Sequence, residues 1–224
     1  MKEALPLGWC RVRVGDLARA DEQPVLTGPF GTNMGRDDFV ASGCPVLTIG
    51  CLTDVGIKVD KAMFVPVDKA IELDRYTLRA GDLLFSRMAS VGRAGIVSQS
   101  LDGALFNYHI MRLRLAAEKM LPELFLAYVR GAPAVRKYLE DVNHGATRDG
   151  INTSQLIAMP VLLPPLNEQR RIVAKLESLQ ERSRRARDSL DAVPALLDKL
   201  RQSILAAAFR GDLTRDFREK HKDL

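Results

Sequence analysis

Short apolar runs separated by turn residues dominate the first three quarters of the chain. The runs lie at 44–52, 62–67, 82–88, 94–98 and 104–115. They are rich in Val, Ile, Phe and Leu, and Gly or Asp bounds most of them, which is typical of β-strands. The last run alternates in side-chain type through Phe106, Tyr108 and Ile110, so Arg112 and Arg114 should face opposite to Leu113 and Leu115.

Helical spacing of apolar residues marks two further segments of this region. One lies around 68–76, and a stronger one runs from about 121 to 140, with Pro122 in its first turn. The second helix offers apolar residues to a core: Phe125, Tyr128, Val129, Val135 and Leu139. Residues 1–166 therefore read as a mixed α+β domain.

A heptad repeat replaces this pattern from Asn167 onward. Its seam begins at Gln169 and advances alternately by three and four positions for about five repeats. A helix with one apolar stripe is not stable alone in water, and the chain supplies no second long heptad helix. The simplest partner is a second copy, so we predict a homodimer. The expected interface residues are Ile172, Leu176, Leu179, Leu190, Val193, Leu197, Leu200 and Ile204.

Proline and glycine set the expected limits of this long helix. Proline inside a helix costs about 3 kcal/mol unless the helix bends or restarts, so we expect a bend or break near Ala192–Pro194. Gly211 is a suitable C-terminal cap. The expected organisation is a domain at 1–166, a dimerisation and spacer helix at 167–208 and a tail at 209–224. The predicted fold class is α+β, a mixed α/β domain followed by a long C-terminal coiled-coil helix.

Charge is concentrated in the second part of the chain. The 224 residues carry a formal net charge of +5, and 46% of them are hydrophobic, enough for a substantial core. Residues 167–224 hold 14 Lys+Arg against 10 Asp+Glu, whereas residues 1–166 hold 19 against 18. This balance permits an acidic partner without demanding one. The basic run at 181–188 fits a solvated, ion-paired helix face better than a phosphate-tracking surface.

The cysteines and the apolar runs indicate a cytoplasmic protein. Cys10, Cys44 and Cys51 form no CxxC motif and lie near no histidine pair, so we expect reduced thiols and no metal. The start of the chain has no apolar run of signal length, and no segment approaches the ~20 apolar residues that cross a bilayer. We therefore expect no membrane association.

No catalytic constellation is visible in the sequence. It lacks the GxxxxGK[ST], HExxH and GxSxG motifs, and His109, His144 and His221 are far apart. FGTNMG at 30–35 is only a weak glycine pattern, and LLPPLN at 162–167 is not the adenine-holding tetrapeptide of methyltransferases. We predict no enzyme activity, no catalytic residues and no bound cofactor.

Three loops have a composition suited to nucleic acid. The segments 27–39, 86–95 and 143–155 each combine glycine, a hydroxyl or amide side chain, and arginine. Arg grips guanine and Asn grips adenine through paired hydrogen bonds, while Ser and Thr suit phosphate oxygens. The alternative is that these are ordinary turns, which favour the same residues. The candidate DNA-binding residues are Thr32, Asn33, Arg36, Arg87, Ser90, Arg93, Thr147, Arg148 and Asn152.

Five segments resemble one known family, in the right order. LLPPLNEQRRIVAKLE (162–177) and LLDKLRQSILAAAFRGDLT (196–214) resemble the conserved helical region of specificity (S) subunits of type I restriction–modification systems. GPFGTNM (28–34), GDLLFSRMASVGRAGIV (81–97) and LPLGWCRVRVGDLA (5–18) resemble segments of the target recognition domain of that family.

The resemblance implies a DNA-reading subunit without chemistry of its own. Family members recognise double-stranded DNA and tether adenine methyltransferase (modification) subunits, which use S-adenosylmethionine and can recruit a restriction subunit. A full-length member has two recognition domains and two helical regions, whereas this chain has one of each. A homodimer would restore two domains and would read an interrupted palindrome, with half-sites ~10 bp apart.

Two other function classes stay open at this point. The chain could be a coiled-coil interaction protein that acts as a decoy or inhibitor, binding the methyltransferase without directing it to DNA. It could also be a stand-alone enzyme, which the missing catalytic motifs disfavour. Methylation of DNA by the complex separates a specificity subunit from a decoy.

Overall fold

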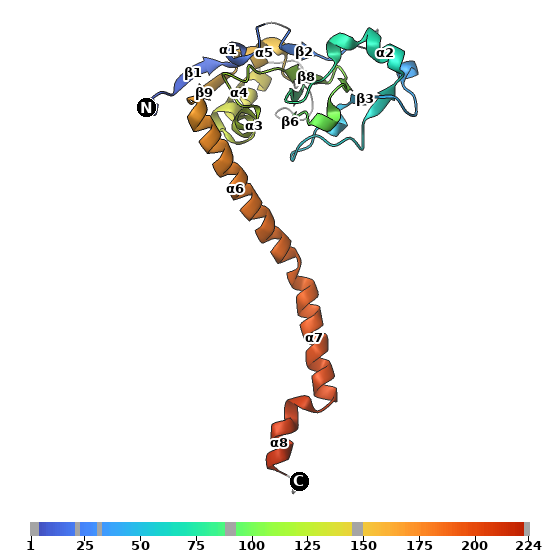
Figure 1. Ribbon diagram of the computed structural model, residues 1–224, viewed down its shortest axis with the longest axis vertical. Helices are drawn as coiled ribbons and strands as arrows, with labels where there is room; N and C mark the ends of the chain where they lie inside the picture. The colour runs from blue at the N-terminus through green and yellow to red at the C-terminus, as the bar shows by residue number, and fades with distance from the viewer. Residues whose placement is uncertain (1–4, 21–22, 31–32, 88–92, 145–149, 222–224) are drawn as a thin grey trace. The chain divides into compact units, whose positions relative to one another are not determined.

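The computed structural model describes residues 5–20, 23–30, 33–87, 93–144 and 150–221 (Figure 1). The chain divides into two compact units, Met1–Val173 and Ala174–Leu224. The first unit combines helices with three small sheets, and the second is helical. The predicted fold class, a mixed α/β domain followed by a long C-terminal helix, is confirmed.

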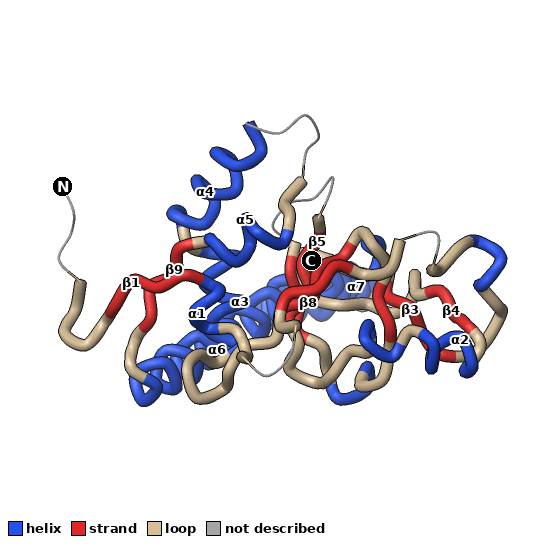
Figure 2. Tube along the Cα trace, turned by 90° about the horizontal axis from the view of Figure 1, so that it is seen from above, coloured by secondary structure: helices blue, strands red, loops and turns tan. Residues whose placement is uncertain are grey.

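A four-stranded antiparallel sheet lies in the middle of the first unit. Its order is β2 (Val25–Thr27), β8 (Ile110–Leu113), β5 (Leu83–Ser86) and β6 (Ala94–Ile96). Side chains alternate along β8 and β5, so that each strand serves two hydrophobic clusters. Met111 and Leu113 belong to the first cluster, and Ile110 belongs to the second. Figure 2 shows β8 and β5 between α1, α3 and α5 at one end of the unit and β3, β4 and α2 at the other.

The second cluster includes residues of a three-stranded sheet. In this sheet β3 pairs antiparallel with β4 and parallel with β7. The elements on this side are β3 (Cys44–Leu47), β4 (Met63–Val65), α2 (Val67–Glu72) and β7 (Leu105–Phe106). Short 3₁₀ turns connect them at Arg36–Asp38, Ile49–Cys51, Asp74–Tyr76 and Gln99–Leu101.

Helices cover the first cluster, together with a two-stranded sheet. The helices are α1 (Val14–Leu17), α3 (Pro122–Gly131), α4 (Pro133–His144) and α5 (Thr153–Ala158). The strands β1 (Cys10–Arg13) and β9 (Pro160–Leu163) pair antiparallel and bring the two ends of this unit together.

The expectation of one helix over 121–140 is wrong. Ala132 is extended, with φ −75° and ψ 122°, and separates α3 from α4. Pro133 explains the break, because the proline ring disfavours helical geometry in the residue before it.

The first turn of α6 (Leu166–Asp191) is fastened to the first unit. Gln169 is fully buried there, and the Trp9 indole N–H donates to Glu168 at 2.9 Å. Ile172 and Val173 pack against the first cluster. Ile172, predicted as a dimer contact, therefore packs against the first unit of its own chain.

The second unit continues α6 into α7 (Val193–Phe209) and α8 (Arg215–Lys220), with a 3₁₀ turn at Asp212–Thr214. Ala192 separates α6 from α7, and Pro194 lies in the first turn of α7, where its missing N–H costs least. Gly211 adopts the left-handed conformation after α7, with φ 73°. Arg184 and Arg185 both pair with Glu181 at 2.8 Å, as on a solvated helix face.

Most of the predicted heptad interface is exposed on these helices. Six of its members have exposed fractions between 41% and 69%: Leu179, Leu190, Val193, Leu197, Leu200 and Ile204. Leu176 is half-buried. None of the helices in the described ranges combines the length and apolar composition of a membrane crossing.

Candidate nucleic-acid interface

The three glycine-containing loops meet at Arg87. This residue directly follows β5 and is the second residue of the segment 86–95. Its backbone N–H donates to the carbonyl of His109 at 3.0 Å, and its own carbonyl accepts from the N–H of Ile151 at 3.0 Å. Ile151 belongs to the segment 143–155, so two of the three loops are joined directly by a backbone hydrogen bond.

The third loop, 27–39, contacts Arg87 and Tyr108 through the side chain of Phe30. The Phe30 ring stacks on Tyr108, with centroids 5.8 Å apart and an interplanar angle of 27°. The Arg87 guanidinium lies 5.9 Å from the Phe30 centroid and donates to the Tyr108 carbonyl at 3.0 Å. We call the group Phe30, Arg87, Tyr108, His109 and Ile151 the loop junction.

A glycine permits this close approach. The Gly28 N–H donates to the carbonyl of Ile110 at 3.2 Å. A Cβ atom at Gly28 would lie 2.3 Å from the backbone carbon and oxygen of Asn107, closer than any real contact. Gly28 is therefore required for the loop 27–39 to reach the junction.

Buried polar groups give the junction unused hydrogen-bonding capacity. Burial lowers the pKa of Arg87. Burial, and to a lesser extent the charge of Arg87, lowers the pKa of His109, which favours the neutral ring. Within the described ranges, Arg87 Nε and His109 Nδ1 have no hydrogen-bond partner. Buried polar atoms are normally paired, so these two atoms are exceptions within the described ranges.

Five of the nine predicted DNA-binding residues lie within the described ranges. Asn33 and Arg36 are exposed on the loop 27–39, and Arg87 lies in the junction. Arg93 instead forms an ion pair with Asp54 at 3.0 Å. Asn152 is the N-cap of α5, where its side-chain oxygen accepts the Gln155 N–H. The other four lie outside the described residues: Thr32, Ser90, Thr147 and Arg148.

Sequence reasoning missed the aromatic part of the junction. It treated 104–115 as one strand, which would hide Tyr108 in regular alternation. The structure separates β7 from β8 by a turn in which Asn107 Oδ1 accepts the N–H of His109 at 3.2 Å. In turns, the side-chain oxygen of Asn commonly accepts a hydrogen bond from the backbone N–H two residues later. Asn107 was thus the available signal. Tyr108, in this turn, is 37% exposed, and Phe30, which stacks on it, is 57% exposed.

The junction carries no metal-ligand set. No group of three or more His, Cys, Asp or Glu side chains suited to a metal occurs in the part of the chain that the structure describes. The local chemistry is aromatic and cationic, which matches nucleic-acid contact.

Comparison with known proteins identifies the family. The model of the type I restriction modification DNA specificity domain matches residues 6–189. The chain belongs to this family. The resemblance noted from the sequence segments is therefore confirmed, and the matched range includes every residue of the loop junction.

Curated members of the specificity-domain family are similar over most of the chain. The EcoKI specificity subunit of Escherichia coli K12 is 30% identical over 187 residues, which cover 81% of this chain and 40% of that protein. The EcoBI specificity subunit of Escherichia coli is 26% identical and matches 100% of this chain and 46% of its own length. The chain thus spans less than half the length of these curated relatives.

A solved structure supports the fold assignment. The HsdS subunit from Thermoanaerobacter tengcongensis superposes with a TM-score of 0.64 at 24% identity. The match covers 94% of this chain and 47% of the HsdS chain. The chain therefore shares the fold of about half of that HsdS chain.

Proposed function

We propose that this chain selects the DNA sequence at which a type I restriction–modification complex acts. The observation that carries the proposal is the meeting of three predicted reading loops at Arg87. Its carbonyl accepts the Ile151 N–H, and its guanidinium lies over the Phe30 ring. Loops from separate parts of the sequence form one surface, as a half-site of several base pairs requires. The chain supplies no chemistry, and methyl transfer belongs to the partner methyltransferase.

The junction offers complementary groups for a base edge. Exposed Phe30 and Tyr108 provide apolar ring surface, which suits contact with the thymine methyl group or stacking on an unpaired base. Exposed Asn33 and Arg36 extend from the same loop as Phe30 and provide amide and guanidinium donors. Arg148 and Thr147 belong to the loop that Ile151 joins to Arg87.

Phosphate affinity is shared with the partner. Residues 1–166 are almost neutral in formal charge, with 19 Lys+Arg against 18 Asp+Glu. Sequence-independent affinity for DNA depends on the number of phosphates that cations neutralise. The isolated chain therefore binds DNA weakly and in a salt-sensitive manner. The methyltransferase provides most of the phosphate contacts of the complex.

Two copies pair through the exposed apolar positions of α6 and α7. Leu190, Leu197 and Leu200 are each more than half exposed in the single chain. Pairing removes this surface from water and places two identical reading domains at a fixed separation. A twofold dimer reads two identical half-sites, so its target is an interrupted palindrome with half-sites ~10 bp apart.

Coexpression with a modification methyltransferase of a type I system tests the function. Methylated adenines mapped across a host genome should define one interrupted palindrome. Arg148→Ala, or the pair Asn33→Ala and Arg36→Ala, should change that sequence or reduce its methylation without dispersing the complex. Lys58→Ala, an exposed cation outside the three loops, is the control. A complex that assembles but methylates no DNA would identify the chain as a decoy, and an unchanged sequence in every loop variant would exclude the loops as readers.

A further inference from the structure

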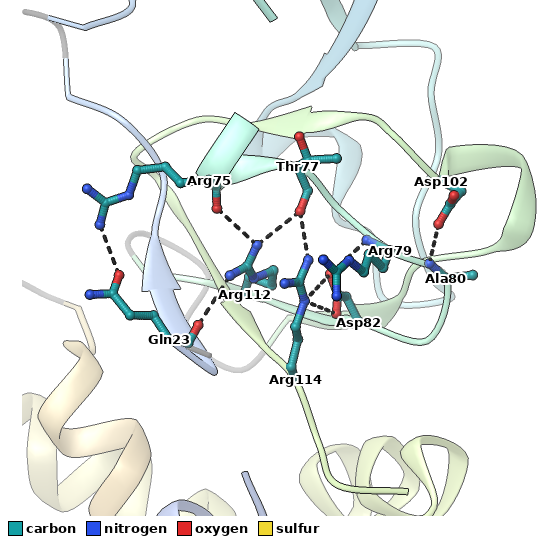
Figure 3. Close-up of polar contacts among 9 residues, drawn as sticks. All are labelled: Gln23, Arg75, Thr77, Arg79, Ala80, Asp82, Asp102, Arg112 and Arg114. Carbon is teal, nitrogen blue, oxygen red and sulfur yellow. Dashed lines mark hydrogen bonds and ion pairs between the residues drawn. The ribbon is translucent and has the colours of Figure 1, made fainter. Parts of the chain in front are cut away.

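An exposed ion pair joins Arg93 to Asp54 near the loop junction. Arg93 Nε donates to Asp54 Oδ1 at 3.0 Å, and the exposed fractions of the two side chains are 42% and 82%. Arg114 and Asp82 form the same type of pair in the interior, where it satisfies polar groups within the fold (Figure 3). An exposed ion pair contributes little to stability. Stability therefore does not account for the Arg93–Asp54 pair.

Strand pairing places Arg93 at the junction end of the four-stranded sheet. β5 and β6 run antiparallel, and the Ser86 N–H donates to the Arg93 carbonyl at 2.9 Å. Ser86 directly precedes Arg87 and is also the partner of Ile110 on β8. Neighbouring strands lie about 4.8 Å apart, so the Arg93 backbone is about 10 Å from that of Ile110. Base pairs follow one another at about 3.4 Å, so Arg93 and the junction can contact the same half-site.

Asp54 lies at the tip of a tight turn that packs on β6. The Thr53 N–H and hydroxyl both donate to the carbonyl of Gly56, at 2.8 and 2.9 Å. Gly56 has φ 150°, a conformation that favours glycine. Gly95 lets the turn approach, because a Cβ atom there would lie 2.6 Å from Ile57 Cγ1. The Asp54 carboxylate is therefore carried on a fixed backbone beside Arg93.

A second guanidinium keeps the surroundings of Asp54 cationic. Arg130, on α3, donates from Nη2 to the carbonyl of Ala94, the residue after Arg93, at 2.7 Å. Burial lowers the pKa of Arg130, and the charge of Asp54 acts in the opposite direction. A carbonyl satisfies a donor without neutralising its charge. Two cations thus flank one carboxylate, and the group remains compatible with a surface that faces DNA.

The ion pair leaves most of the donors of Arg93 unused. It engages Nε, and within the described ranges the Arg93 side chain has no other polar contact. Nη1 and Nη2 can therefore donate together. Two such donors match O6 and N7 of guanine in the major groove, the commonest specific contact between arginine and DNA. A carboxylate on Nε restricts the guanidinium, so less entropy is lost when it binds.

We propose that Arg93 reads a guanine of the DNA half-site and that Asp54 is the positioning residue that orients it. Asp54 holds Nε, while Nη1 and Nη2 donate to O6 and N7 of the base. The inference rests on the proposed function, since it takes DNA to be the ligand. It adds a side chain outside the three loops to the reading surface, and it names one base of the half-site.

The test uses the complex of the full chain with a modification methyltransferase, on a duplex that carries the mapped methylation sequence. Each guanine is replaced in turn by 7-deazaguanine, which pairs normally but lacks the N7 acceptor. At one position the replacement should weaken binding by wild type about fivefold or more, and by less than about twofold in Arg93→Ala. Arg93→Ala should itself lower the preference for target over non-target DNA about tenfold or more.

Two further variants separate geometry from charge at Arg93 and Asp54. Arg93→Lys keeps the charge but lacks the planar fork, so it should keep non-target affinity and lose the N7 effect. Asp54→Ala should lower target preference about threefold to tenfold, with non-target affinity unchanged or raised. Asp68→Ala, which removes the same charge from an exposed position of α2, should leave target preference unchanged. Thermal unfolding of every variant should stay close to wild type.

Four results would overturn the inference. A mapped half-site without guanine, or an N7 effect that persists in Arg93→Ala, would exclude Arg93 as the reader of guanine. An equal rise in affinity for target and non-target DNA in Asp54→Ala would show that the carboxylate only masks Arg93. A large loss of stability in Asp54→Ala would assign the pair to the fold. These results on a methylating complex contradict this inference alone, whereas a complex that methylates no DNA contradicts the proposed function itself.

Discussion

Gln169 fastens the long helix α6 to the rest of the first unit through Leu121. Its Oε1 accepts the Leu121 N–H at 2.9 Å across 48 positions of sequence, and its Nε2 donates to the carbonyls of Lys119 at 2.8 Å and Pro164 at 2.9 Å. Leu121 is the N-cap of α3, so one amide side chain ties the starts of two helices together. This contact gives a physical reason for the glutamine in the PPLNEQ segment.

Replacing Gln169 with Ala should lower the free energy of unfolding by about 2 kcal/mol. The substitution leaves the Leu121 N–H and the carbonyls that Gln169 served without their buried partner, at about 1–3 kcal/mol for an unsatisfied group. Urea denaturation followed by Trp9 fluorescence measures the change. Gln180→Ala, in an exposed position of the same helix, should alter stability by less than about 0.5 kcal/mol. Equal effects of the two substitutions would contradict the anchoring role.

Gly28→Ala should disrupt the loop junction. Its new methyl group would overlap the Asn107 backbone, which cannot move without displacing the turn before β8. Overpacking of this kind costs typically about 1–3 kcal/mol. We expect lower stability, and loss of target methylation by the complex at temperatures where the variant stays folded.

Gly131→Ala is the matched control for Gly28. A Cβ there meets nothing within 4 Å, and Gly131 ends α3 in ordinary geometry. Alanine favours helix over glycine by about 1 kcal/mol, so this variant should be as stable as wild type or more so. Thermal unfolding of both variants measures whether stability falls in Gly28→Ala and is kept or raised in Gly131→Ala.

His109 should make stability fall as the pH decreases. Burial, aided by Arg87, lowers the pKa of its imidazole in the folded state below the ordinary value near 6.5. The unfolded chain therefore takes up the proton first, so the stability is fully present above about pH 6.5 and is lost as the pH falls through the folded pKa. The free energy of unfolding between pH 7 and pH 5 should decline less in His109→Asn than in wild type. If the free energy of unfolding of both proteins changed with pH in parallel, His109 would not contribute to the pH dependence of stability.

Local sequence patterns predicted several strands, whereas the pairing of distant strands and the break between two helices were not predicted. Val, Ile and Leu runs bounded by turn residues marked β3, β4, β5 and β6, because a buried pleated strand requires such residues. The strands β1 and β9 pair across about 150 positions, and no local pattern identifies a partner that far along the chain. The break between α3 and α4 was visible in Pro133 but was outweighed by the helical spacing on both sides.

Composition found the loops but could not assign their side chains. Gly, Asn and Arg predicted three segments, and Arg87 brings all three together. Asn152 and Arg93 have the right chemistry for bases, yet one caps α5 and the other pairs with Asp54, since tertiary contacts compete for the same donors and acceptors. Phe30 and Tyr108 were missed because exposed aromatic residues have no periodic signature.

The last prediction concerns dimerisation through the exposed seam. Leu190 is 69% exposed and Leu197 is 59% exposed in the single chain, which leaves their apolar surface available to a second copy. Leu190→Lys/Leu197→Lys places a charge at each position. An unpaired buried charge costs about 3 kcal/mol or more, and each 1.4 kcal/mol changes affinity tenfold, so the dimer should dissociate at least a hundredfold more readily. Light scattering over a range of concentrations measures the association.

A charge-matched variant separates burial from electrostatic repulsion. Ala195→Lys/Gln202→Lys adds the same two charges to α7 at exposed positions off the seam, and it should remain dimeric. Far-ultraviolet circular dichroism of both variants verifies that the helices persist. If the wild-type chain is a folded monomer at micromolar concentration, and the methyltransferase does not bring two copies together, the seam is not a dimer interface. The palindromic target then loses its physical basis, because one recognition domain reads only one half-site.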